Sequence, residues 1–178
     1  MPRKSIALIS TGGTIEKTYD ELSGVLSNKL SVLDYMLASL EIEGIEIVRV
    51  PLLNKDSLDM DEADHALIAK TAREKAETHD GVVIVHGTDR LTTSGDRIHD
   101  LLSGPASGGE ARVPIVLTGA MRPYIMRNTD AVQNFTEALL AVQILAPGVY
   151  VAMHNKVLQF PGVEKDYERG TYIKSEKT

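Results

Sequence analysis

Five short apolar runs, each rich in β-branched residues, recur along the chain. Runs of this kind are typical of strands that are buried on both faces, as they are in a parallel sheet. The five expected strands are Ile6–Ile9, Ile45–Val50, Val82–Val85, Ile115–Leu117 and Val149–Met153. The pattern therefore predicts a central sheet built from five parallel strands.

The segments between these runs carry apolar side chains at helical spacing. Asp59 and Glu62 predict an N-cap with a capping box. The apolar stripe that follows this cap comprises Ala63, Leu67, Ile68, Ala72 and Ala76. A second stripe, ended by Pro147-Gly148, comprises Ala131, Phe135, Leu139, Val142 and Leu145. Shorter helices are expected over Leu91–Leu102 and from a Ser31 cap to Leu40.

Strands that alternate with helices in this order predict an α/β fold. We expect a doubly wound, mostly parallel sheet flanked by helices, a three-layer sandwich of the Rossmann or flavodoxin-like kind. The length of 178 residues fits a single domain, residues 1–178, and no domain boundary is visible. Residues 15–28 predict a hairpin or mobile flap around Ser23-Gly24, and residues 161–178 predict a polar tail.

Composition argues against several classes of function. Lys and Arg number 19 against 25 acidic residues, so the net charge is −6 and no nucleic-acid partner is expected. The lack of cysteine excludes a disulfide scaffold and a thiolate metal site, and the five histidines show no metal-ligand spacing. No apolar run approaches the roughly 20 residues of a membrane span, and the start of the chain is a poor signal peptide. We therefore expect a cytoplasmic protein with no membrane partner.

Polar and glycine-rich segments follow each expected strand. In open α/β sheets, ligands bind beyond these carboxyl ends of the strands. The segments are Ser10-Thr-Gly-Gly-Thr14, Asn54-Lys-Asp-Ser57, His86-Gly-Thr-Asp89 and Thr118-Gly-Ala-Met-Arg-Pro123, with the fifth strand leading toward Lys165. The edge of the sheet is therefore predicted to carry one converging polar site with hydroxyl, carboxylate and lysine side chains.

Each of these residues also has an ordinary structural interpretation. Gly12-Gly13 alone is typical of a tight turn, and it lacks the spacing of a dinucleotide-binding loop or a P-loop. Thr14 and Thr88 could satisfy backbone groups in turns, and Asp89 could cap a helix. Lys165 could be a solvated surface lysine. The combination of these residues favours a site more strongly than any one of them.

Three motifs occur in order, each after an expected strand. They are Thr-Gly-Gly-Thr-Ile at 11–15, His-Gly-Thr-Asp at 86–89 and Gly-Ala-Met-Arg-Pro at 119–123. With these motifs the chain resembles the bacterial-type L-asparaginase family from about residue 5 to residue 165. The resemblance implies an amidohydrolase that converts L-asparagine to L-aspartate and ammonia through a threonyl acyl-enzyme, with no cofactor and no metal.

The resemblance also implies catalytic roles at individual positions. Thr14 matches the nucleophile that attacks the side-chain amide carbonyl of asparagine. Thr88, Asp89 and a lysine match the second catalytic set, and alignment of Asn155-Lys-Val-Leu with the family's strand and loop places that lysine at Lys165. His86, next to this set, is interpreted as a structural residue.

The substrate-binding positions follow from the same resemblance. Ser57 matches the residue that grips the α-carboxylate, Asp89 matches the partner of the α-ammonium, and the carbonyl of Ala120 matches the group that faces the leaving amide. The complete expected set is Gly13, Asp56, Ser57, Gly87, Thr88, Asp89, Ala120 and Tyr19. Tyr19 lies closer to Thr14 than the flap tyrosine does in the secreted bacterial enzymes.

Elementary chemistry supports these roles. A threonine hydroxyl is a poor nucleophile at neutral pH and needs a base or a proton relay, which a lysine beside Asp89 could supply. Backbone N–H groups at 12–14 and 87–89 could bind the developing oxyanion, a contribution of about 3–4 kcal/mol per donor in other enzymes.

The chain departs from the family's pattern in length and at Leu58. Family members usually add a smaller C-terminal domain that lends an acidic residue to a neighbouring subunit. Since this chain has no room for that domain, we expect a short single-domain member that forms a homo-oligomer, a dimer or tetramer. Leu58 stands where long members often carry a glutamine, so a looser grip on the α-amino group is expected.

Two other functions remain open. A non-catalytic amino-acid-binding or regulatory module would have kept the site and lost turnover. The amidase subunit of a tRNA-dependent amidotransferase also resembles this family, but it calls for an extra N-terminal domain and a basic RNA-binding face. Hydrolysis of L-asparagine is favoured because every proposed reactive residue is present.

Overall fold

A six-stranded sheet forms the centre of the computed structural model, which describes residues 3–28, 31–103 and 110–175. The strand order is β4-β1-β5-β6-β7-β8. The strands are β1 (Lys4–Gly12), β4 (Ile45–Lys55), β5 (Gly81–Val85), β6 (Pro114–Thr118), β7 (Gly148–Met153) and β8 (Lys156–Gln159). All neighbours pair in parallel except β7 and β8, which are antiparallel. The five predicted strands are confirmed, and β8 adds an edge strand that the pattern did not predict.

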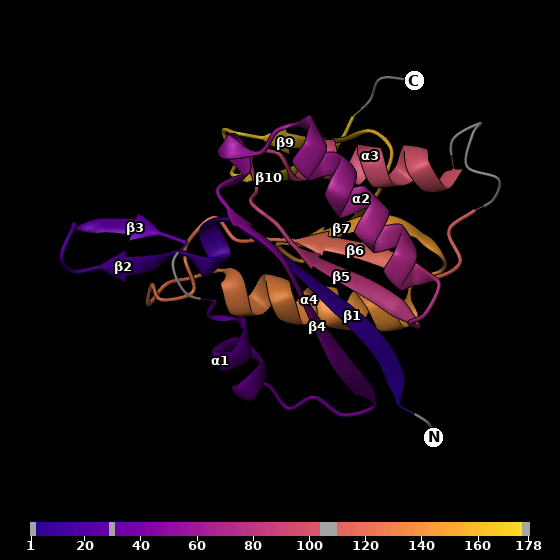
Figure 1. Cartoon of the computed structure of the whole chain (residues 1–178), viewed down its shortest axis with the longest axis horizontal. Coiled ribbons are helices and arrows are strands. Elements are labelled where there is room, and N and C mark those ends of the chain that lie inside the picture. Colours follow the sequence, from indigo (N-terminus) through magenta and orange to yellow (C-terminus); the bar gives the residue numbers. More distant parts are fainter. Residues whose placement is uncertain (1–2, 29–30, 104–109, 176–178) are drawn as a thin grey trace.

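Helices cover both faces of this sheet, which confirms the predicted three-layer α/β sandwich. The helices are α1 (Leu33–Ala38), α2 (Glu62–Ala76), α3 (Leu91–Ser103) and α4 (Ala131–Ile144). In Figure 1, α2 and α3 lie above the sheet while α1 and α4 lie below it. Two separate apolar cores result, one on each face of the sheet.

Strand β5 illustrates why the predicted strands are continuous apolar runs. Val82 and Ile84 pack into the core beneath α2 and α3, whereas Val83 and Val85 pack into the core beside α4. All four side chains are fully buried. Because both faces of the sheet are covered, no position along the strand has to be polar.

The sheet reverses its direction of growth beside β1. Strand β1 pairs with β4 on one side and with β5 on the other, so the chain runs first one way across the sheet and then the other. In doubly wound folds, ligands bind in the crevice at such a switch point, outside the carboxyl ends of the strands. The loops that leave β1 and β5 at this end carry Thr14 and Thr88.

The capping of α2 differs from the prediction by two residues. The N-cap is Asp61, whose side chain accepts a hydrogen bond from the Asp64 N–H at 2.9 Å, while Asp64 accepts one from the Asp61 N–H at 3.1 Å. Asp59 ends a short 3₁₀ turn, Ser57–Asp59, which Asp56 caps through the Leu58 N–H. This turn takes up the residues that the sequence pattern assigned to the helix start.

The buried faces of the helices agree only in part with the apolar stripes predicted from the sequence. In α2, Ala63 and Leu67 are exposed, and the buried face instead runs through His65, Ile68 and Ala72. The α4 stripe is buried from Ala131 to Val142, as expected, and the helix ends at Ile144. Helix α1 ends at Ala38 rather than Leu40. Its N-cap is Val32 rather than Ser31, although the Ser31 hydroxyl accepts a long hydrogen bond from the Leu33 N–H at 3.4 Å and donates to the Glu16 carboxylate at 2.7 Å.

Two hairpins flank the carboxyl end of the sheet. Strands β2 (Thr18–Asp20) and β3 (Val25–Ser27) pair within the segment where a hairpin or flap was expected, and they project to the left of the sheet in Figure 1. The polar tail expected over residues 161–178 instead forms a second hairpin, β9 (Val163–Asp166) and β10 (Thr171–Lys174). This hairpin is anchored by Tyr172, which is 2% exposed. Residues 176–178 lie outside the described residues.

Candidate active site

Glycine residues bring the loops at the carboxyl end of the sheet into backbone contact. A Cβ atom on Gly13 would lie 2.4 Å from the Gly87 Cα, and one on Gly87 would lie 2.6 Å from the Ser57 Oγ. A Cβ on Gly119 would lie 2.4 Å from the His86 carbonyl oxygen. Real Cβ atoms do not approach other atoms so closely, so only glycine allows these four loops to meet. The predicted convergence of the strand ends is therefore present.

Three hydrogen bonds to backbone groups hold the loop that carries Thr14. The Gly12 N–H donates to the Glu16 carboxylate at 3.2 Å, and the Gly13 N–H donates to the Lys55 carbonyl at 2.9 Å. The Asn28 side chain donates to the Gly13 carbonyl at 2.8 Å. Gly13 has φ 80°, in the left-handed region that glycine adopts without strain. Within the described residues the half-buried Thr14 hydroxyl makes no hydrogen bond, so it is not used to satisfy the turn.

Thr88, Asp89 and Lys165 form one hydrogen-bonded cluster. Lys165 Nζ donates to Thr88 Oγ1 at 3.0 Å and to Asp89 Oδ1 at 2.7 Å. The Lys165 side chain is 10% exposed, which contradicts its interpretation as a solvated surface lysine. Nζ also lies 4.8 Å above the centroid of the Tyr167 ring. The structure therefore brings together the three residues that the resemblance grouped as a catalytic set.

The β9–β10 hairpin positions this lysine and also grips the Thr88 backbone. Tyr172 lies directly across the hairpin from Lys165, and its hydroxyl donates to the Thr88 carbonyl at 2.7 Å. Burial, with a smaller contribution from Asp89, raises the pKa of Tyr172 well above its ordinary value, so the phenol stays a donor. The two cross-strand neighbours thus hold Thr88 by its hydroxyl and by its carbonyl.

Ser57 is positioned but unpaired. It is 1% exposed, it lies against Gly87, and its Oγ has no hydrogen-bond partner among the described residues. An unpaired buried hydroxyl is costly, so Ser57 is a group for which a bound ligand could supply the partner. Its neighbour Leu58 is 60% exposed.

Asp56, also expected to bind substrate, is engaged by the protein itself. Its carboxylate accepts hydrogen bonds from the Leu58 N–H at 3.0 Å and from Lys17 Nζ at 2.5 Å. The hydrogen bond from Lys17 lowers the pKa of Asp56. Lys17 precedes the β2–β3 hairpin, so this pair ties the hairpin to the end of β4. Both side chains border a polar cavity of about 420 Å³ between these two elements.

The loop that carries Ala120 is held from behind by α4. Asn134 donates to the Gly119 carbonyl at 2.9 Å, and Asp130 accepts from the N–H groups of Met121 and Arg122 at 3.0 and 2.9 Å. These three bonds fix the backbone on both sides of Ala120, and a further bond from the Asn134 side chain to Asp130 joins the two side chains that make them. Ala120 itself is fully buried.

Tyr19 lies apart from the tightly packed residues. It is 62% exposed on β2, where it pairs with Leu26 of β3. Its expected contact with a substrate stays a prediction.

Three residues around the site were not predicted from the sequence, namely Tyr172, His65 and Ser94. Tyr172 lies in a segment interpreted as a polar tail, although Thr171-Tyr-Ile173 is a run of residues that favour strands. His65 and Ser94 lie on the buried faces of α2 and α3, and the Ser94 hydroxyl is hydrogen-bonded both to His65 and to His86. No sequence pattern relates these three residues.

The described residues contain neither a cluster of metal-ligand side chains nor a helix suited to a membrane. In residues 3–28, 31–103 and 110–175, no group of three His, Asp or Glu side chains is placed to hold a metal ion. Over the same residues, every helix is too short or too polar to cross a membrane.

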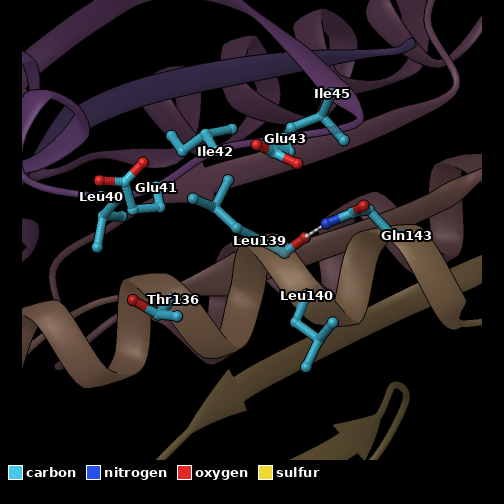
Figure 2. Close-up of a pocket in the computed structure, with 9 residues that line it drawn as sticks. All are labelled: Leu40, Glu41, Ile42, Glu43, Ile45, Thr136, Leu139, Leu140 and Gln143. Carbon is cyan, nitrogen blue, oxygen red and sulfur yellow. Dashed lines mark hydrogen bonds between the residues drawn. The ribbon is translucent and has the colours of Figure 1, made fainter. Parts of the chain in front are cut away.

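A second cavity, of about 260 Å³, lies on the far side of the sheet from α2 and α3. It is bounded by the connection between α1 and β4 and by α4, and Figure 2 shows Leu139 pointing toward Ile42 across it. Glu41 and Glu43 are the acidic residues in its lining. The cavity contains none of the expected site residues.

Comparison with known proteins identifies related sequences and structures. The family model described as Asparaginase, N-terminal matches residues 5–168. The L-asparaginase of Thermococcus kodakarensis is 32% identical over 167 residues, which cover 93% of this chain and 48% of the relative. One subunit of the glutamyl-tRNA(Gln) amidotransferase of Methanococcus vannielii is 30% identical over 156 residues, which cover 86% of this chain and 35% of the relative. The chain therefore spans half or less of the length of these relatives.

Solved structures give the same grouping. The thermostable L-asparaginase from Thermococcus kodakarensis superposes with a TM-score of 0.83 at 29% identity, over 96% of this chain and 51% of that one. A probable cytoplasmic L-asparaginase from Campylobacter jejuni superposes with a TM-score of 0.77 at 28% identity, over the same shares of the two chains.

Proposed function

Because the chain belongs to the asparaginase family, we propose that it is an amidohydrolase that converts L-asparagine to L-aspartate and ammonia. The observation that carries the proposal is the bonding of Lys165 Nζ to both Thr88 and Asp89, beside a loop that presents the Thr14 hydroxyl without a partner among the described residues. No metal or cofactor is needed for this chemistry.

The proposed reaction begins at Thr14. Its Oγ attacks the side-chain carbonyl of asparagine, and its proton passes through Thr88 and Lys165 to the leaving nitrogen, which departs as ammonia. Water then attacks the resulting ester, which releases aspartate and returns a proton to Thr14. The loops of Thr14 and Thr88 touch at Gly13 and Gly87, which supports transfer between them.

Substrate binding is assigned to groups around this pair. The unpaired Ser57 hydroxyl would donate to the α-carboxylate. Asp89 uses Oδ1 to bind Lys165 and is 31% exposed, which leaves its second oxygen for the α-ammonium. N–H groups of the Gly13 and Gly87 loops would bind the oxyanion, and the Ala120 carbonyl would face the leaving amide. Asp56 would act indirectly, because Lys17 and the Leu58 N–H already occupy its carboxylate.

A second candidate is the amidase half of a tRNA-dependent amidotransferase. The observation in its favour is the 30% identity to one component of the Methanococcus vannielii amidotransferase. Such a component would release ammonia for a partner protein. Against it stand the net charge of −6 and the lack of a basic cluster for RNA. The third possibility, a binding module without turnover, would explain an intact site in an inactive chain.

Ammonia release by the purified chain separates these three functions. The asparaginase predicts multiple turnovers on L-asparagine alone. The amidotransferase component predicts turnover that depends on a partner protein and charged tRNA. The binding module predicts no ammonia, together with a melting temperature that rises in L-aspartate.

Light scattering on the same sample tests the proposed homo-oligomer, and a monomer would contradict it. A cytoplasmic location is proposed by analogy with the Campylobacter jejuni neighbour.

A further inference from the structure

A buried chain of hydrogen bonds lies behind the Thr88 loop. His86 Nδ1 lies 2.8 Å from the Gly87 carbonyl oxygen, and His86 Nε2 lies 2.8 Å from Ser94 Oγ on α3. The same Ser94 Oγ lies 2.8 Å from His65 Nδ1 on α2. The two imidazole rings stack at 6.2 Å with an angle of 13° between their planes. All three side chains are 2% exposed or less.

The proton positions in this chain of hydrogen bonds follow from which groups can donate and which can only accept. A carbonyl oxygen has no hydrogen, so His86 Nδ1 must donate to Gly87. Burial lowers the pKa of His86 to about 4, so the ring is neutral and its Nε2 accepts from Ser94. Ser94 has one proton, which is then used, so its oxygen accepts from His65 Nδ1. The bonds therefore run in one direction, from His65 through Ser94 and His86 to the Gly87 carbonyl.

The protonation of His65, at the α2 end of this chain of hydrogen bonds, is also defined. Burial lowers the pKa of His65. Its Nε2, with Nδ1 protonated, is a bare acceptor and has no hydrogen-bond partner among the described residues. A core built only for packing would carry apolar side chains at these positions, because buried polar groups are costly. Three buried polar residues that end on a loop carbonyl indicate a role at that loop.

The loop carbonyl determines where the next N–H points. The Gly87–Thr88 peptide is planar, so its carbonyl and its N–H face opposite sides. Since the carbonyl faces His86 in the core, the Thr88 N–H faces away from it. Tyr172 and Lys165 hold the other groups of Thr88, its carbonyl and its hydroxyl.

We propose that Ser94, between His65 and His86, is a positioning residue that fixes the Gly87–Thr88 peptide with its N–H toward the reacting amide. This rests on the proposed amide hydrolysis. This relay, the chain of hydrogen bonds from His65 through Ser94 and His86 to the Gly87 carbonyl, touches no substrate and acts through Gly87. It keeps the Thr88 N–H aligned for the oxyanion, where a misalignment of about 1 Å costs on the order of 100-fold in rate.

The direction of the relay can be tested without any assay of activity. Nitrogen-15 NMR of the wild-type chain should show His65 and His86 as neutral Nδ1–H tautomers at pH 7. In Ser94→Ala, the backbone amide resonance of Thr88 should shift, and Ser94→Thr, which keeps a hydroxyl, should largely restore it. An Nε2–H tautomer at His86, or an unchanged Thr88 amide in Ser94→Ala, would overturn the proposal.

A matched pair of variants tests the functional consequence. An asparagine amide nitrogen can replace imidazole Nδ1, whereas a glutamine amide nitrogen replaces Nε2. His86→Asn therefore keeps a donor for Gly87, and His86→Gln does not. We expect kcat on L-asparagine to fall about tenfold in His86→Asn and about 100-fold in His86→Gln and Ser94→Ala, with KM changed less than threefold.

Equal losses in the two His86 variants at equal melting temperature would overturn the positioning role, because only the asparagine variant keeps the donor to the Gly87 carbonyl. If the wild-type chain releases no ammonia, the proposed function fails, and the tautomers and the Thr88 amide still decide on the relay. If the wild type is active while its tautomers are reversed, the relay fails and the proposed function stands.

Discussion

Lys165 and Thr88 are 77 residues apart in the sequence, and their side chains lie 3.0 Å apart in the fold. The contact exists because the β9–β10 hairpin folds back over the end of β5. It joins a lysine from a segment that the sequence pattern predicts as a tail to the threonine of the His-Gly-Thr-Asp motif. The proposed proton transfer depends on this contact.

Removal of the Lys165 amine should abolish turnover while the fold persists. We expect Lys165→Met to lower kcat by about 10²–10⁴-fold, the range for loss of a general acid or base. The matched control is Lys70→Met, because Lys70 is 65% exposed and its ion pair with Glu74, at 3.9 Å, lies on the surface of α2. Steady-state kinetics and thermal melting measure both variants. A kcat in Lys165→Met within threefold of the control would contradict the assignment.

Ser57→Ala should affect stability and binding in opposite ways. Because the buried Oγ has no partner within the described residues, its removal should leave the free energy of unfolding unchanged or slightly higher. The KM for L-asparagine should nevertheless rise by tenfold or more, since the α-carboxylate loses a donor, roughly 1.5 kcal/mol or more. Urea denaturation and initial rates test the two effects. A drop in stability with an unchanged KM would show that Ser57 is only structural.

Tyr172→Phe tests the second contact of the hairpin with Thr88. Loss of the 2.7 Å bond leaves a buried carbonyl unpaired, so stability should fall by about 1–3 kcal/mol. We also expect a lower kcat, because Thr88 loses one of its anchors. Tyr35→Phe serves as the control, since Tyr35 is 73% exposed. The prediction fails if both phenylalanine variants melt at the wild-type temperature.

Stability should decline in mild acid because of His86. In the unfolded chain this histidine titrates near 6.5, whereas burial in the folded chain lowers its pKa to about 4. Between these values the unfolded state binds more protons, so the stabilising contribution is complete above pH 6.5 and is lost as pH falls toward 4. The loss from this group is about 3 kcal/mol. Urea unfolding at stepped pH should show a flatter slope for His86→Asn, and equal slopes would contradict the prediction.

L-Glutamine should be a much poorer substrate than L-asparagine. The loops of Thr14 and Thr88 are in backbone contact at Gly13 and Gly87. We expect the site beside this contact to fit the shorter side chain, and one extra methylene is worth about 1–3 kcal/mol of discrimination. That range corresponds to roughly a 10- to 200-fold difference in kcat/KM. Rates of ammonia release from L-asparagine and from L-glutamine measure this ratio. Comparable kcat/KM values would show that the pocket accepts the longer side chain equally well.

The sequence predicted the centre of the fold well because that part depends on local pattern. Runs such as Val82–Val85 are apolar at every position since both faces of β5 are covered. The motif residues at the ends of β1 and β5 could be placed at one edge because parallel strands end together.

The remainder depends on contacts between distant segments. Tyr172 is buried because the β9–β10 hairpin packs on the core and on Thr88, and these contacts are not visible in its own polar segment. Helix α2 begins two residues later than predicted because Asp56 caps a 3₁₀ turn before it, and a turn this short has no periodic sequence pattern. His65 and Ser94 are polar residues on helices, and their pairing with His86 depends on how α2 and α3 pack together.

Thr14 is proposed to carry the covalent step of amide hydrolysis. This role is tested by the rate of ammonia release from L-asparagine by the wild-type chain and by Thr14→Ala, with Thr93→Ala on the exposed face of α3 as the control. We predict release by the wild type and the control, and a loss of several orders of magnitude in Thr14→Ala with an unchanged melting temperature. Near-native release by Thr14→Ala would contradict the role of Thr14 as the nucleophile.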